Sequence, residues 1–382
     1  MISQEHRRLL GAYRMPAEWE PHRATYLVWP HNRDTWPGKF ETIPPIFAQI
    51  AAAIASFEPV RILVEDEMQI ASVGAIIRDA SAPDGHRVRM DRIELLPIAT
   101  NDSWIRDFGP IFVNKIARVD ARITQIARAD GNEAQIARDD GRNAQIALDF
   151  RFNSWGEKYG DFHLDDAVPR RLGERYGFEV IEAGMVLEGG SIDVNGAGVV
   201  LTTESCLLNK NRNPNISRGE IEECLKVYLG ATQVLWLGDG IAGDDTDGHV
   251  DDLARFVATD TIVTVVEQDP ADANYKVLQD NLTRLRAMRD ANGRPFRIET
   301  LPMPPALFHE GTRLPASYAN FYIVNGGVIM PTFGCAADSI ARATLERVRP
   351  GRRAVGIPST DLVWGLGAIH CLTQQHPAVQ SG

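Results

Sequence analysis

The residue best suited to nucleophilic chemistry is Cys371, in the glycine-rich stretch GLGAIHCLTQQHP that starts at Gly365. A thiolate is the reactive form of cysteine, and a nearby positive charge, an imidazolium or a cationic substrate favours it. The other three cysteines lie in helical or apolar stretches, which is typical of inert buried thiols. Cys371 is therefore the candidate nucleophile, with a buried inert cysteine as the alternative.

A histidine among carboxylates, in GDDTDGHVDD from Gly243, is the candidate acid and base. If this segment is extended, the side chains of His249 and Asp251 point to the same face and can reach one ligand. Nearby carboxylates favour the imidazolium form, which suits a group that donates a proton and later accepts one. A capped turn carrying a surface histidine is the alternative.

Two other interpretations of this stretch are weaker. The glycines of GDGIAG, from Gly238, match the dinucleotide-binding pattern, but the carboxylates that follow would repel a pyrophosphate; they are Asp244, Asp245 and Asp247. A calcium loop requires a glycine at its sixth position, which would be Gly248. That alignment puts Gly243 and Ala254 where acidic ligands are needed.

A second polar cluster, NDSWIRDFGP from Asn101, groups Asp102, Arg106 and Asp107 around Trp104. Carboxylates beside an indole suit a planar or cationic group, which they hold by paired hydrogen bonds and cation-π attraction. A surface ion pair of Arg106 with Asp107 beside a core tryptophan is the alternative. Glu188, in LEGGS, adds a carboxylate before two glycines that allow close backbone approach.

Short β-branched runs alternate with helical stretches along the chain, which predicts an α/β fold. Strands are expected at 24–29, 60–64, 111–113, 199–202, 233–237, 261–266 and 319–324, and helices at 43–57, 218–229, 274–289 and 337–348. Several strands end in the polar clusters described above. Because α/β folds build their sites in loops at strand ends, these clusters are expected to form the site.

A ten-residue repeat interrupts this alternation, with Ile-Ala recurring at Ile116, Ile126, Ile136 and Ile146. Its Asp-Gly turns predict an insertion over 115–147, an extended hairpin or mobile loop within a single catalytic domain spanning 1–382. Such an insertion costs little, because loop-closure entropy grows slowly with length. The repeat contains no plausible chemistry, and a partner-binding arm is the alternative.

The composition limits the compartment and the partners. With 382 residues, 44% of them hydrophobic, the chain can bury a large core without disulfides or metals. A net charge of −11 argues against nucleic acid or anionic lipid as partners. The cysteines show no C-x-x-C spacing and no accompanying histidine cluster, so neither a zinc site nor a disulfide framework is expected. Without a signal peptide or an apolar run of ~20 residues, a cytoplasmic protein is expected.

These segments together resemble the agmatine deiminase family, within the wider group of bacterial-type peptidyl-arginine deiminases. The resemblance runs in order through MPAEWEPH at Met15, NDSWIRDFGP, FNSWGEKY, LEGGSIDVNG, TTESCLLNKNRNP, DDTDGHVDD and HCLTQQHP. It implies a pentein fold, an α/β propeller of five pseudo-repeated ββαβ-type units around a central site, with no metal or organic cofactor. One departure is GLGAIHC, where Leu366 and Ala368 replace the Gly and Asn of the family's usual GGGNIHC.

By motif, the resemblance places the nucleophile on Cys371, the acid and base on His249, and the partner of that histidine on Glu188. The guanidinium-holding carboxylates fall on Asp107 and Asp251. The expected substrate-binding residues are Trp104, Asp102 and Asp245. The implied reaction hydrolyses agmatine to N-carbamoylputrescine and ammonia through an amidino-cysteine intermediate, a step toward putrescine.

Three alternatives stay open at this point. A deiminase of free or peptidyl arginine would act on the same guanidinium group. A substrate with an α-carboxylate calls for an Arg or Lys at the far end of the pocket, whereas a substrate with an amine tail calls for a carboxylate there. An amidinotransferase would pass the same intermediate to an amine. A non-catalytic protein could bind polyamines or guanidines. The expected partner is a small cationic guanidine, with no nucleic acid or membrane, and a homo-oligomer stays open.

Overall fold

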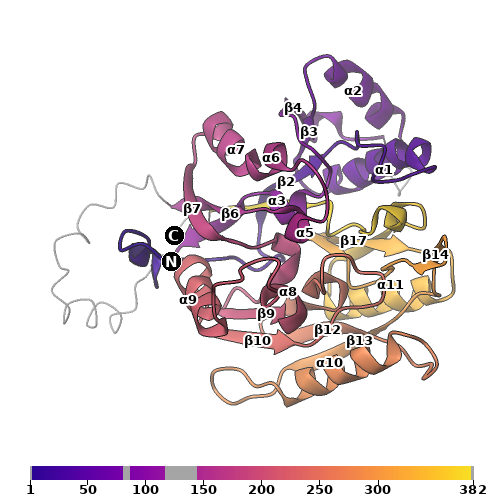
Figure 1. Cartoon of the computed structure of the whole chain (residues 1–382). Helices are drawn as coiled ribbons and strands as arrows, with labels where there is room; N and C mark the ends of the chain where they lie inside the picture. The colour runs from indigo at the N-terminus through magenta and orange to yellow at the C-terminus, as the bar shows by residue number, and fades with distance from the viewer. Residues whose placement is uncertain (1, 81–86, 117–143, 380–382) are drawn as a thin grey trace.

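The computed structural model describes residues 2–80, 87–116 and 144–379 of the chain (Figure 1). Most of the predicted insertion, 117–143, lies outside these residues. The two strands that flank it, β5 (Ile111–Lys115) and β6 (Gln145–Arg151), pair antiparallel, with Asn114 opposite Gln145. The last repeat, QIALD, therefore begins β6, and its Ile146 is buried in the core.

Five sheets of the described chain share one plan: two antiparallel strands, then a helix, then a strand parallel to the second. Four of these units follow the chain in order. They are β5, β6, α7 (Val168–Tyr176) and β7 (Glu179–Val186); β8 (Ile192–Val194), β9 (Val199–Thr203), α9 (Arg218–Leu229) and β10 (Gln233–Leu237); β11 (Ala254–Ala258), β12 (Thr261–Val266), α10 (Tyr275–Ala287) and β13 (Arg297–Pro302); and β16 (Tyr322–Val324), β17 (Gly327–Thr332), α11 (Ala337–Val348) and β18 (Arg353–Pro358).

The fifth unit combines both ends of the chain. Its first strand, β19 (Gln374–Pro377), pairs antiparallel with β2 (His22–Val28), which leads through α1 (Ile43–Ala55) to the parallel β3 (Val60–Val64). A further helix and strand, α2 (Gln69–Asp79) and β4 (Ile93–Pro97), extend this sheet. The five ββαβ units agree with the predicted α/β pentein class.

The remaining elements are short. The two-residue β1 (Tyr13–Arg14) pairs with β5, and β14 (Phe308–His309) forms a small ribbon with β15 (Thr312–Arg313). Short helical turns connect the units: α3 (Ile105–Phe108), α5 (Ser154–Glu157), α6 (His163–Asp166), α8 (Glu204–Leu207), η1 (His6–Leu9), η2 (Phe40–Thr42), η3 (Met90–Arg92), η5 (Gly189–Ser191), η6 (Val250–Asp252) and η7 (Leu362–Gly365).

The helices cover strands that are buried over most of their length. All five residues of β9 are buried, as expected for strands covered on both faces. In Figure 1, α2, α7, α9 and α10 lie at the periphery of the molecule. Local signals fix their ends: α9 begins with a capping box of Ser217 and Glu220 and ends at Gly230 in the left-handed conformation.

Most of the predicted elements match the observed ones. The predictions at 60–64, 233–237 and 261–266 coincide with β3, β10 and β12, and those at 218–229 and 337–348 with α9 and α11. The strand predicted at 319–324 starts only at Tyr322, because Ser317 and Asn320 turn their side chains to Asp252. The segment before this strand therefore belongs to the site.

Candidate active site

The candidate site lies where the segments before the first strand of each unit meet. These segments are α3, η5, η6, the residues around Asn320, and His370 with Cys371. Asp107 in α3 accepts a hydrogen bond from the backbone N of Gly190 in η5, at 3.0 Å. Asn320 Nδ2 lies 3.1 Å from Cys371 Sγ and 3.0 Å from Asp252 Oδ1. Residues more than 200 positions apart in the sequence thus reach one point.

Cys371 lines a cavity of about 580 Å³ and is itself only 5% exposed. Its Sγ lies 3.7 Å from Asp251 Oδ2. Burial raises the pKa of this thiol well above its usual range, and the charges of Asp251, Asp252 and Asp107 raise it further. The thiol therefore stays protonated until a positive charge enters the cavity.

Both carboxylate oxygens of Asp107 are fixed. Oδ1 accepts from Gly190, and Oδ2 accepts from the indole Nε1 of Trp155 at 2.9 Å. Burial raises the pKa of Asp107 to about 6; the charge of His249 opposes this, and those of Asp251 and Glu188 add to it. This carboxylate is partly protonated near neutral pH and would ionise fully beside a cation.

Arg106 does not form the surface ion pair with Asp107 that was considered. Its guanidinium is buried and turns away, donating from Nη1 to Gln374 Oε1 at 2.8 Å and to Gln375 Oε1 at 2.7 Å. Its Nη2 lies 3.6 Å from Glu18 Oε2. Arg106 therefore does not compensate the charge of Asp107, and this charge stays available to a ligand in the cavity.

His249 is fully buried beside two carboxylates, so the surface-histidine alternative is wrong. Its Nδ1 lies 3.7 Å from Asp107 Oδ1 and its Nε2 lies 4.0 Å from Glu188 Oε2. Neither ring nitrogen has a hydrogen-bond partner among the described residues. The ring is therefore packed in place with both nitrogens available for proton transfer.

Asp251 lies in the short 3-10 turn η6 and His249 directly precedes it, so the segment is not the extended chain on which their shared face was predicted. Both side chains nevertheless face Gly190. A Cβ added there would lie 2.6 Å from His249 Nδ1 and 3.1 Å from Asp251 Oδ2. Glycine at position 190 is required for this close approach.

Glu188 is buried and accepts a hydrogen bond from Arg212 Nε, while Arg212 Nη1 also contacts Asp247 Oδ2 at 2.6 Å. Glu188, His249 and Cys206 each place one ligand-type atom within 4.8 Å of the other two. Cysteine spacing did not reveal this set, because its members come from three separate segments. The guanidinium of Arg212 beside Glu188 disfavours a metal cation there.

The predicted substrate-binding residues Trp104, Asp102 and Asp245 all line the cavity. The Trp104 ring lies against Gly367, where an added Cβ would be 2.5 Å from the indole, so this glycine makes room for the ring. Burial raises the pKa of Asp102 to about 6. Asp245 lies near the neighbouring Tyr159, whose hydroxyl donates to Asp245 Oδ2.

The described lining of the cavity is strongly acidic. It contains seven carboxylates and neither Lys nor Arg; the acids are Asp34, Asp102, Asp107, Asp161, Asp165, Asp245 and Glu310. A wall of this kind attracts a cation and repels an anion.

Residues 14–377 match the sequence pattern of the Porphyromonas-type peptidyl-arginine deiminase family. The chain belongs to this family. It is 37% identical to the agmatine deiminase of Pseudomonas aeruginosa, with 96% of each chain covered, and 35% identical to that of Medicago truncatula, with 99% and 100% covered. The solved agmatine deiminase of Enterococcus faecalis matches the fold with a TM-score of 0.82 at 32% identity, covering 97% of both chains.

The hydrogen bonds of the site bring forward residues that the sequence had not singled out. Trp155 lies within FNSWGEKY and Arg212 within TTESCLLNKNRNP, so the motifs contained them without indicating their roles. Asn320 lies in SYANFY, which carries no recognisable signal. Its Oδ1 accepts from the backbone N of His370 at 2.8 Å and so orders the segment that carries Cys371.

The two departures from the family's GGGNIHC pattern lie at different depths. Leu366 lines the cavity with a φ of 69°, in the left-handed region that favours glycine. Ala368 is buried in an apolar cluster, where an Asn would need polar partners. No helix among the described residues is long and apolar enough to cross a membrane.

Proposed function

We propose that this chain is an agmatine deiminase, which hydrolyses agmatine to N-carbamoylputrescine and ammonia. The observation that carries the proposal is a buried thiol in a cavity lined by carboxylates, with neither Lys nor Arg among the described lining residues. Agmatine carries a guanidinium at one end and an ammonium at the other. Both charges are matched by such a cavity.

Substrate binding would place the guanidinium between Asp107 and Asp251. Asp251 Oδ1 has no hydrogen-bond partner among the described residues, whereas its Oδ2 is already used. Paired hydrogen bonds to the two carboxylates fix the guanidinium plane against Cys371 Sγ. The arriving positive charge also offsets the carboxylates that raise the pKa of the thiol, so the substrate itself favours the thiolate.

In the first chemical step the thiolate attacks the guanidinium carbon and forms a C–S bond. Protonated His249 delivers a proton to the departing nitrogen, the C–N bond breaks, and ammonia leaves. A planar, cationic amidino-thioether remains on Cys371. Neutral His249 then takes a proton from water, which attacks the same carbon; the C–S bond breaks, releasing the ureido product and the thiolate. Glu188 Oε2 lies 4.0 Å from His249 Nε2 and faces the ring during this step.

The tail of the substrate decides between agmatine and arginine. Free arginine would bring an α-carboxylate into the cavity, where the described wall offers repulsion and no cationic partner. An amine tail instead finds carboxylates, among them Asp102, Asp165 and Asp245. Peptidyl arginine lacks both the amine and the free carboxylate, so it stands as the second candidate substrate.

The test measures ammonia and ureido product from agmatine, free arginine and an arginine-containing peptide. We expect turnover of agmatine alone, with none for Cys371→Ala and normal turnover for Cys224→Ala, whose thiol is buried away from the site. Preference for an arginine substrate would overturn the choice of substrate. Binding without ammonia release would favour the non-catalytic alternative, and transfer to an added amine would indicate an amidinotransferase.

A single catalytic domain, a cytoplasmic location, and the lack of nucleic-acid or membrane partners stay predictions. The formal net charge of −11 supports the predicted lack of nucleic-acid or membrane partners.

A further inference from the structure

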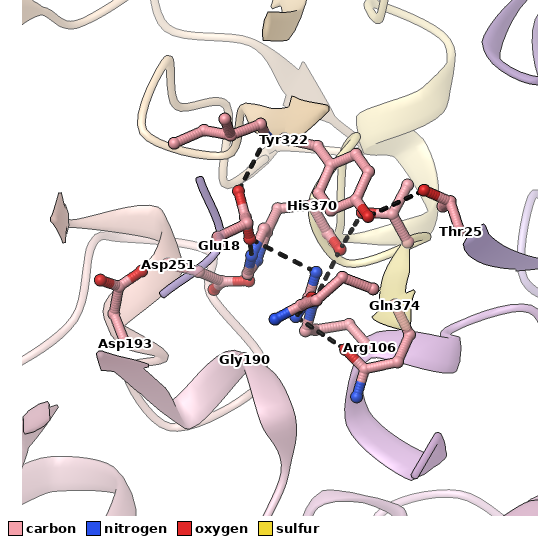
Figure 2. A network of polar contacts seen from close by, with 12 residues as sticks. Glu18, Thr25, Arg106, Gly190, Asp193, Asp251, Tyr322, His370 and Gln374 are labelled. Carbon is pink, nitrogen blue, oxygen red and sulfur yellow. Dashed lines mark hydrogen bonds and ion pairs between the residues drawn. The ribbon is translucent and has the colours of Figure 1, made fainter. Parts of the chain in front are cut away.

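A second histidine lies directly behind the nucleophile. His370 precedes Cys371 in the chain and is 2% exposed. Its Nδ1 lies 2.6 Å from Asp251 Oδ2, and its Nε2 lies 2.8 Å from Glu18 Oε2. Figure 2 shows the ring beside Glu18 and Asp251, with Arg106 close by. Each ring nitrogen thus has a carboxylate oxygen as its only hydrogen-bond partner among the described residues.

The far carboxylate, Glu18, is held from several directions. Its Oε2 accepts from Arg255 Nη2 at 2.7 Å, and its Oε1 accepts from the backbone N of Ile323 at 2.8 Å. Burial opposes ionisation of Glu18, but the charges of Arg255, His370 and Arg106 outweigh it and hold the pKa far below its usual range. Glu18 is therefore an anion.

The near carboxylate, Asp251, is ionised for a related reason. Burial would raise its pKa, but the hydrogen bond and the charge of His370 lower it below its usual value. An ionised carboxylate only accepts hydrogen bonds. Both ring nitrogens of His370 thus lie at hydrogen-bond distance from a carboxylate oxygen, and a ring that donates from both nitrogens is an imidazolium.

We propose that His370 is a positioning residue, held as an imidazolium, that keeps Asp251 ionised and fixes its Oδ2 so that Oδ1 faces the guanidinium. The role rests on the proposed function, because it acts through Asp251 on the guanidinium of the substrate. It also explains a buried charge that the deimination steps themselves do not use. The hydrogen bond from His370 to Glu18 holds the ring in place, so that the ring does not move with Asp251 toward the cavity.

Several other charged and titratable groups surround this pair. Among the described residues, the charged and titratable side chains that face His370 or Asp251 include Glu18, Arg106, Asp107, Asp244, His249, Asp252, Arg255, Tyr322 and Cys371. Without His370, the negative charges of the neighbouring Asp107 and Asp252 would raise the pKa of Asp251. Asp252, which has such neighbours, shows the result: burial and the charges of Asp251 and Asp244 raise its pKa well above the usual range.

The first experiment compares His370→Gln with His376→Gln. His376 is an equally buried histidine whose ring centroid lies 4.1 Å from that of Phe112. Its printed hydrogen bonds go to Tyr26, Arg61 and Gln145, outside the site, so its variant controls for lost packing. We expect His370→Gln to raise KM for agmatine at least about tenfold, because Asp251 becomes protonated and free to rotate. We also expect the acidic limb of kcat/KM to move to higher pH. Equal profiles for the two variants would overturn the proposal.

A second variant, Glu18→Gln, covers the case in which His370→Gln does not fold. It removes one anion and keeps the shape of the side chain, so the ring can lose a proton while the contact remains. We expect a shift of the acidic limb in the same direction and of smaller size. An unshifted limb in Glu18→Gln would count against the imidazolium.

A third measurement does not depend on activity. In the protein labelled with 15N-histidine, both ring nitrogens of His370 should carry a hydrogen over the whole pH range of activity. A ring nitrogen without hydrogen would refute the proposal. If both hydrogens are present but agmatine is not turned over, the proposed function fails while the charge state of His370 stands, so the two failures are distinguishable.

Discussion

Buried carboxylates on the two sides of Cys371 differ in whether an arginine compensates their charge. Behind the nucleophile, three buried carboxylates are paired with arginine. Arg255 contacts Glu18 and Asp193, and Arg212 contacts Glu188. These ion pairs are almost fully excluded from solvent, so each guanidinium compensates a charge that would otherwise be very costly.

On the cavity side the deep carboxylates are left without such partners. Asp102, Asp107 and Asp165 form no ion pair with Lys or Arg among the described residues. Burial raises the pKa of Asp102 and Asp107 to about 6 and that of Asp165 well above its usual range. Arginines therefore compensate the carboxylates behind Cys371, whereas the deep carboxylates on the cavity side remain to be compensated by a cationic ligand.

The largest expected effect comes from breaking a pair on the inner side. Replacing Arg255 with Met leaves Glu18 and Asp193 buried without their common partner. We expect the free energy of unfolding to fall by about 3–5 kcal/mol, measured by urea denaturation. Arg89→Met, which breaks an exposed pair with Asp91, is the control and should change stability little. A similar loss in both variants would contradict the comparison.

On the cavity side, Asp107→Asn should separate stability from activity. The variant keeps the shape of the side chain but cannot neutralise the guanidinium, so kcat/KM for agmatine should fall by roughly 10²–10³-fold. Stability at neutral pH should change little, because removing a buried charge without an arginine partner offsets the loss of one acceptor for Gly190 N or Trp155 Nε1. Asp161→Asn, at the exposed part of the cavity wall, serves as the control with a small expected effect. A loss of stability in Asp107→Asn would show that this carboxylate supports the fold.

The pH dependence of stability should have opposite signs on the two sides. Asp107 has a folded-state pKa of about 6, above the unfolded value of about 3.9, so its contribution is fully present below pH ~4 and is lost as pH rises through about 6. Glu18 has a lowered folded-state pKa, so its contribution is present above its unfolded value of about 4.3 and is lost at lower pH.

Urea denaturation from about pH 2 to about pH 7 would detect this difference. Asp107→Asn should remove a fall in stability with rising pH near pH 6, and kcat/KM of the unmodified protein should decline below about pH 6 because Asp107 must be ionised to bind the guanidinium. An unchanged pH slope in Asp107→Asn would contradict the raised pKa.

The sequence predicted what depends on local signals. The helices predicted at 218–229 and 337–348 match α9 and α11 to the residue, and polar clusters at strand ends marked Asp107, Glu188, His249 and Cys371. These clusters do converge in space, as the loops of an α/β fold allow.

The remainder depends on which distant segments meet. Nothing near His370 in the sequence shows that Glu18, some 350 residues away, accepts from its ring. Asn320 was included in a predicted strand, and Arg106 was considered a surface residue. Burial and pairing of this kind are properties of the assembled units, so no local pattern in one sequence contains them.

The smallest expected effect concerns Leu366, whose backbone conformation could not be predicted either. A leucine at a φ of 69° carries a strain of about 1–2 kcal/mol that glycine avoids. We expect Leu366→Gly to raise the free energy of unfolding by up to ~1 kcal/mol, because the greater entropy of glycine in the unfolded chain cancels part of the gain. Leu366→Ala keeps the Cβ and the strain, so it should bring no such gain. Because Leu366 lines the cavity, both variants lose the same side chain there, and any common change in KM reports that loss rather than the strain.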